Sequence, residues 1–104
     1  MVDTLGKIRR LEHYVTVNRE AVDPVVDRTL DKLISREASN LEALQGRLRL
    51  QVEEFEQAHA MKSDDFTARF ERGELGDATD FIEWASTLQM LTRVEEQLAA
   101  LQRT

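Results

Sequence analysis

The 80 residues that follow Pro24 contain no second proline, and this absence constrains the fold more than any other feature. The whole chain has only four glycines, and Ala, Leu, Glu, Gln and Arg dominate the stretch after Pro24. These five residue types favour helices, whereas proline and glycine are the residues that usually end them. The sequence therefore predicts an all-α protein.

Apolar spacing predicts one long helix over 24–60. Asp23 and Pro24 suit its start, because aspartate can accept from the free amides of the first turn and proline needs no donor there. A capping-box pattern at 39–42 and Gly46 argue for an interruption. The apolar face keeps its phase across both, so we favour a continuous helix. That face comprises Leu30, Leu33, Ile34, Leu41, Leu44, Leu48, Val52 and Phe55.

Two further helices are predicted after it, a short one over 63–72 and a longer one over 78–103. Gly73 stands where a left-handed residue would end the short helix. Asp80 and Glu83 form a second capping-box pattern at the start of the last helix, with Asp77 or Thr79 as rival caps. A long helix, a short tip helix and a second long helix together predict an antiparallel helical hairpin.

The segment 1–22 is predicted to form a short N-terminal helix that completes a single helical domain over 1–104. Its helical pattern covers 3–15, and residues 16–23 are read as the first connection. Leu5, Ile8, Leu11 and Val15 share one face of this helix. Residues 14–17 alternate in a manner typical of strands, so an extended end is the weaker alternative.

The lengths of the two hairpin arms predict self-association. The arms differ by about 19 Å at about 1.5 Å per residue, so part of the longer helix lies beyond its hairpin partner. Its apolar residues there need cover from the N-terminal helix or from another chain. We therefore expect a homodimer with an interface at Leu30, Leu33, Ile34 and Leu41.

No residue pattern points to catalysis, a cofactor or a metal. The chain has no cysteine, which excludes disulfides and thiolate metal sites. His13 and His59 are the two histidines, and neither has another histidine at ligand spacing. Glycine-rich phosphate loops and nucleophile elbows do not occur. We therefore expect a protein that is not an enzyme.

The net charge of -6 is concentrated near one end of the proposed hairpin. Residues 61–83 hold three basic and seven acidic side chains, so -4 of the charge lies there. Helix caps and a solvated loop explain most of these acids, and a surface that docks on a basic partner is the alternative. Trp84, Phe66, Phe70 and Phe81 are expected to form the core of the tip, with an exposed aromatic contact as the alternative.

Basic residues gather only at Lys7, Arg9 and Arg10. An acidic chain with one small basic cluster argues against a broad nucleic-acid surface, although DNA contact through these three residues stays open. Apolar runs are too short to span a membrane, and no signal-peptide core is evident. A cytoplasmic location is the simplest expectation.

The stretch 61–91 resembles the C-terminal signature of a group of small prokaryotic helical proteins. Its elements are Phe-x-x-Arg-Phe at 66–70, Gly-Glu-Leu-Gly-Asp at 73–77 and Asp-Phe-x-Glu-Trp at 80–84. Proteins of this group look like antitoxins of type II toxin–antitoxin pairs. The resemblance implies a partner-binding role for Glu74, Asp77, Asp80, Glu83 and Trp84. The chain departs from the group at Ala78 and Thr79, where an acidic pair is common.

These observations favour a non-enzymatic protein-binding module, an antitoxin-like protein that sequesters a small partner protein. A structural homo-oligomer of coiled-coil-like helices is the first alternative. A DNA-binding autoregulator is the second.

Overall fold

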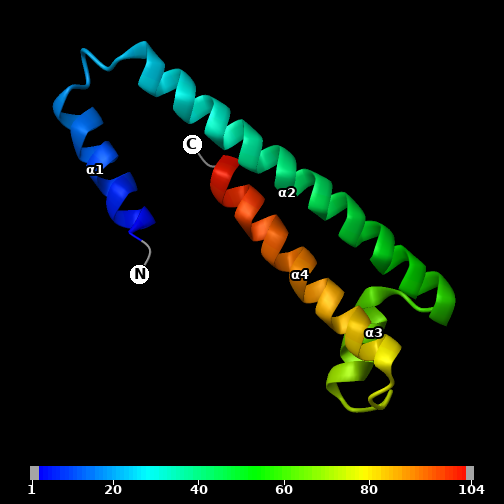
Figure 1. Ribbon diagram of the computed structural model, residues 1–104. Coiled ribbons are helices and arrows are strands. Elements are labelled where there is room, and N and C mark those ends of the chain that lie inside the picture. Colours follow the sequence, from blue (N-terminus) through cyan, green and yellow to red (C-terminus); the bar gives the residue numbers. More distant parts are fainter. Residues whose placement is uncertain (1–2, 103–104) are drawn as a thin grey trace. The chain divides into compact units, whose positions relative to one another are not determined.

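The computed structural model describes residues 3–102, and within them the chain forms four helices and no strand (Figure 1). The predicted all-α fold is thus confirmed. The elements are α1 (Thr4–Val17), α2 (Pro24–His59), α3 (Ser63–Glu71) and α4 (Thr79–Gln102). The predicted ranges also included residues 1, 2, 103 and 104, which lie outside the described residues.

The chain divides into two compact units, Met1–Ser35 and Arg36–Thr104. We refer to them as unit 1 and unit 2. Helix α2 contributes its first 12 residues to unit 1 and the rest to unit 2. The single domain expected over 1–104 stays a prediction.

Helix α2 runs unbroken for 36 residues, so the predicted continuity is confirmed. Its start follows the expected chemistry, because the amide of Val25 donates to the Asp23 carboxylate at 2.8 Å. The capping-box pattern at 39–42 lies inside α2 and does not mark the start of a new helix. Gly46 is exposed and has no heavy atom within 4 Å of where a Cβ would stand, so it does not disturb the packing of the helix.

Unit 2 is built on the antiparallel pairing of α2 and α4, which Figure 1 shows running back along the longer helix. Leu48 of α2 is buried with Val94 and Leu98 of α4. The half-buried side chains packed against this cluster are Ala38, Leu41, Leu44 and Leu91. The apolar face predicted from residues 41 to 55 therefore serves the hairpin itself.

An aromatic cluster joins α3 to both long helices at the end of the hairpin. Phe66 of α3 and Trp84 of α4 are fully buried, and their rings stack with centroids 3.9 Å apart and planes 4° from parallel. Phe55 of α2 stacks on the same tryptophan at 5.8 Å. The indole N–H of Trp84 donates to the hydroxyl of Ser63 at 3.2 Å. The predicted aromatic core is confirmed for Phe66 and Trp84, and the exposed alternative is wrong for Trp84; Phe70 and Phe81 are half-buried.

Gly73 ends α3 in the left-handed conformation that its position predicts, with φ of +73°. Its amide donates to the carbonyl of Phe70, and the amide of Glu74 donates to that of Arg69, both at 3.0 Å. This pair of bonds is a Schellman motif, which reverses the chain direction directly after the helix. A side chain at this φ would strain the turn.

The predicted helix boundaries lie close to the observed ones, except at the end of α1. Helix α1 ends at Val17, two residues into the predicted connection and short of residue 22, because both amides of Asn18 donate to the carbonyl of Tyr14 and close the last turn. Residues 14–17 are accordingly helical and not extended. Helix α4 begins at Thr79, so Asp80 lies in its first turn and is not its cap. Helices α2 and α3 start at Pro24 and Ser63 as predicted, and each ends one residue before its predicted end.

Unit 1 pairs α1 with the first turns of α2. Ile8, Leu11 and Val15 of α1 line a shallow apolar pocket together with Leu30 of α2. No residue of α1 is buried. The packing of unit 1 is therefore much sparser than that of unit 2.

We expect Phe66→Ala to lower the free energy of unfolding by about 3–5 kcal/mol, because it removes a fully buried ring from the stack. The control is Leu50→Ala at a position of α2 that is 61% exposed, which should change stability by less than about 0.5 kcal/mol. Urea denaturation followed by circular dichroism measures both. Similar small losses in the two variants would contradict the central role of the stack.

Candidate functional site

Four of the predicted partner-binding residues carry exposed carboxylates at the α3–α4 connection, and we call this set the acidic tip. Glu74 and Asp77 lie in the loop, and Asp80 and Glu83 lie in the first turns of α4. The left-handed Gly73 and Gly76 shape that loop. The acidic tip is therefore presented by a tight turn between two helices of unit 2.

Two of the four carboxylates have a partner within the chain. Glu74 accepts a hydrogen bond from the Arg72 guanidinium, which lowers the pKa of Glu74 and raises the pKa of Arg72. Asp80 lies 3.3 Å from Nε2 of His59. For Asp77 and Glu83, residues 3–102 supply no basic group within ion-pair distance. These two carboxylates are left to solvent or to another molecule.

His59 is a member of the site that the sequence did not indicate. The structure places it against α4, beside Asp80. Its ring lies 5.0 Å from that of Phe81 and 5.7 Å from that of Trp84. Only the pairing of α2 with α4 brings residues 59 and 80 together, and no local pattern could have indicated it.

Trp84 is the predicted contact residue that the structure removes from the surface. Its side chain is fully buried between Phe66 and Phe55, so it has no accessible surface with which to touch a partner. Its role is to hold α3 against α4 beneath the acidic tip. The resemblance implied that Trp84 binds a partner, but its burial leaves it only a structural role in unit 2.

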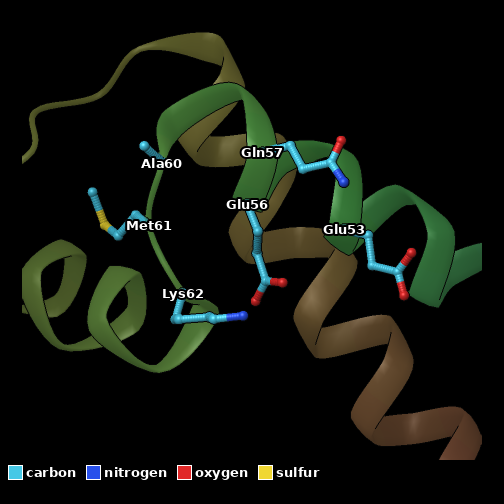
Figure 2. A pocket seen from close by; sticks show the side chains of 6 residues that line it. All are labelled: Glu53, Glu56, Gln57, Ala60, Met61 and Lys62. Carbon is cyan, nitrogen blue, oxygen red and sulfur yellow. The ribbon is translucent and has the colours of Figure 1, made fainter.

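The segment between α2 and α3 is fixed by Glu56, which sequence reasoning missed. Its carboxylate accepts from the amide of Ser63 at 2.8 Å and so satisfies the first turn of α3. Figure 2 shows Glu56 pointing from α2 toward the chain that leads into α3, beside Lys62. Ser63 itself accepts from the indole of Trp84. One serine therefore connects all three helices of unit 2.

The pKa of Glu56 is lowered from its ordinary value. The main cause is the hydrogen bond from the backbone amide of Ser63, followed by a bond from the Ser63 hydroxyl, while Lys62 contributes less. The open pocket around this residue is lined by Glu53, Glu56, Gln57, Ala60, Met61 and Lys62 (Figure 2). Because Glu56 is already used as a cap, we assign this pocket a structural role.

The predicted dimer residues fall into three environments. Leu33 and Ile34 are 49% and 45% exposed, as an unfilled interface requires. Leu30 is half-buried and lines the pocket shared with α1. Leu41 packs against the Leu48 cluster of unit 2, so its apolar surface is largely covered within the chain.

Three further features of the described residues bear on the predicted metal, membrane and nucleic-acid properties. Among residues 3–102, no group of three or more His, Cys, Asp or Glu side chains is arranged to hold a metal ion. None of the helices in this part of the chain combines the length and hydrophobicity that crossing a bilayer demands. Lys7, Arg9 and Arg10 are exposed on α1.

Comparison with protein-family profiles, with curated proteins and with solved structures finds no significant match to this chain. Functional inference therefore rests on the acidic tip and on the exposed apolar surfaces.

We expect Glu56→Gln to destabilise the protein by about 0.5–1 kcal/mol at about pH 7, the low part of the range for helix caps, because the carboxylate is largely solvated. Since the pKa of Glu56 is lowered in the folded chain, its contribution is present above the pKa of the unfolded chain. It is lost as the pH falls through the folded pKa.

The stability difference between wild type and Glu56→Gln should therefore shrink as the pH falls through the lowered pKa of Glu56, because the carboxylate then takes up a proton. Denaturant titrations at several pH values measure it. Glu53→Gln, one turn earlier on the exposed side of α2, is the control. A difference that stays constant with pH would show that the charge of Glu56 is not what caps α3.

Proposed function

We propose that this protein is a non-enzymatic protein-binding module whose acidic tip docks on a basic surface of a partner protein. The observation that supports this most is the presence of Asp77 and Glu83, two exposed carboxylates that have no basic partner among residues 3–102. Carboxylates on a rigid support complement a basic patch and steer its approach.

The segment that carries the acidic tip is held rigidly. The Schellman turn at Gly73, the cap from Glu56 and the aromatic stack all restrict the segment that carries the acidic tip. A surface that is ordered before binding loses less conformational entropy when its partner arrives. The charges of the acidic tip would therefore align the partner and raise its association rate. The rigidity of the tip would raise the affinity of the complex.

The resemblance of residues 61–91 to antitoxin-like proteins leads us to propose the class of partner. An antitoxin of this kind would sequester a small toxin by covering its active surface. The partner would then be a basic protein encoded beside this one.

Co-expression with the adjacent reading frame tests this function. We expect the neighbouring product to arrest growth alone, and wild-type protein to co-purify with it and restore growth. Glu74→Lys/Asp77→Lys should weaken the complex by about tenfold or more, because two attractive charges become repulsive. The control is Glu42→Lys/Glu96→Lys, which makes the same change in charge at exposed helix positions away from the tip. A harmless neighbour that forms no complex would overturn the proposal.

Unit 1 favours a second candidate, a homo-oligomer. Its exposed apolar side chains are Leu5, Ile8, Leu11, Tyr14, Val17, Val25, Leu33 and Ile34, and α1 buries none of its residues. Helices as short as α1 are marginal in water without packing. Residues 1–35 contain six basic and six acidic side chains, so two copies of this unit would not repel each other.

Light scattering at micromolar concentration checks the second candidate. We expect twice the 12.0 kDa mass of one chain for wild type, and a single-chain mass for Leu33→Lys/Ile34→Lys. The control is Leu50→Lys, which places a charge at an exposed leucine of unit 2. A single-chain mass for wild type would exclude the dimer.

A further inference from the structure

An open groove of about 560 Å³ lies between α2 and α4 in unit 2. Its apolar part includes Phe55 of α2 together with Ile82 and Met90 of α4. Ile82 and Met90 are 50% and 47% exposed, and both line the same groove. The groove thus offers apolar surface that the chain itself leaves uncovered.

The groove combines one aromatic ring in a fixed position with a flexible methionine side chain. Phe55 is half-buried and stacks on Trp84 with an interplanar angle of 9°, so its ring is held in place by the aromatic core. Met90 has an unbranched, polarizable side chain that fits partners of differing shape. Ile82 and Met90 are eight residues apart on α4, a separation of about two helical turns or 12 Å.

Three carboxylates border the apolar part: Glu54 from α2, and Asp80 and Glu83 from α4. In the part of the chain that the structure describes, no lysine or arginine lines the groove. His59 faces Asp80, while Glu54 and Glu83 have no basic partner among residues 3–102. Such a rim attracts cationic side chains and repels the phosphates of nucleic acids and anionic lipids.

The helical walls of the groove also favour one secondary structure for the bound segment. Helices satisfy their backbone groups internally, so the groove presents no strand edge that an extended peptide could join. Two antiparallel helices instead accept a third helix between them, as in a bundle. The groove extends over Gln51 to Ala58 on α2 and Asp80 to Met90 on α4, enough for two or three turns of a bound helix.

We propose that this groove binds a basic amphipathic helix of the partner protein, with apolar residues on Phe55, Ile82 and Met90 and lysine or arginine on Glu54, Asp80 and Glu83. The proposal rests on the proposed function and specifies how the partner is held. It also enlarges the binding surface, because Asp80 and Glu83 belong to both the acidic tip and the groove rim. The tip would orient the partner, and the groove would bury its apolar anchors.

The full-length protein is titrated with a labelled synthetic helix of about 18 residues that carries leucine on one face and lysine and alanine on the other. The same composition in scrambled order, which has no apolar face, is the peptide control. Two groove variants are compared with matched controls: Glu54→Lys/Glu83→Lys with Glu42→Lys/Glu96→Lys, and Ile82→Ser/Met90→Ser with Leu50→Ser. Circular dichroism confirms that each variant remains helical.

We expect the amphipathic helix to bind at least about tenfold more tightly than the scrambled peptide. Each groove variant should weaken binding by about tenfold or more, and each control variant by less than about threefold. Equal losses in groove and control variants would overturn the proposal, because binding would then reflect overall charge alone. A wild-type dimer that only Glu54→Lys/Glu83→Lys dissociates would overturn it too, because a second copy would then fill the groove.

Binding of the protein encoded by the adjacent gene distinguishes the groove proposal from the proposed function. Loss of the complex in Glu54→Lys/Glu83→Lys and in Ile82→Ser/Met90→Ser supports the groove. Retention of the complex in both groove variants, with loss in Glu74→Lys/Asp77→Lys, overturns the groove and leaves the proposed function standing.

Discussion

The stacking of Phe66 on Trp84 is the interaction on which unit 2 depends. A nine-residue helix such as α3 is too short to be stable alone, and this contact anchors it to α4. The same tryptophan packs on Phe55 of α2 and donates to Ser63, which in turn is held by Glu56. One buried ring therefore fixes the positions of three helices and, with them, the acidic tip and the floor of the groove.

The two units divide the physical properties of the chain between them. Unit 1 has equal numbers of basic and acidic residues and leaves most of its apolar side chains exposed, whereas the whole net charge of -6 lies in residues 36–104. A neutral apolar surface suits association with a like copy, while an acidic one repels a like copy and suits a basic partner. The two proposed modes of association therefore use different parts of the molecule and can be tested independently.

Sequence reasoning was most successful where the decisive interactions are local. The start of α2 at Pro24, its continuity through Gly46 and the left-handed Gly73 all follow from preferences of single residues or short windows. It left alternatives open where a local pattern had several possible meanings, as at Asp80, which resembled a cap and instead lies in the first turn of α4. Leu41 shows a related limit, since an apolar face predicts burial without saying which surface covers it.

Periodicity, composition and charge were enough to determine an all-α chain with a long helix, a tip helix and a concentration of acids near the turn. Only the tertiary structure decided which of these residues are accessible: Trp84 is enclosed, Ile82 and Met90 stay uncovered, and His59 meets Asp80 across 21 residues of sequence. The physical reason is that helix formation depends on contacts within four residues, whereas burial depends on which helix faces pair. That pairing is set by the shapes of side chains far apart in the sequence.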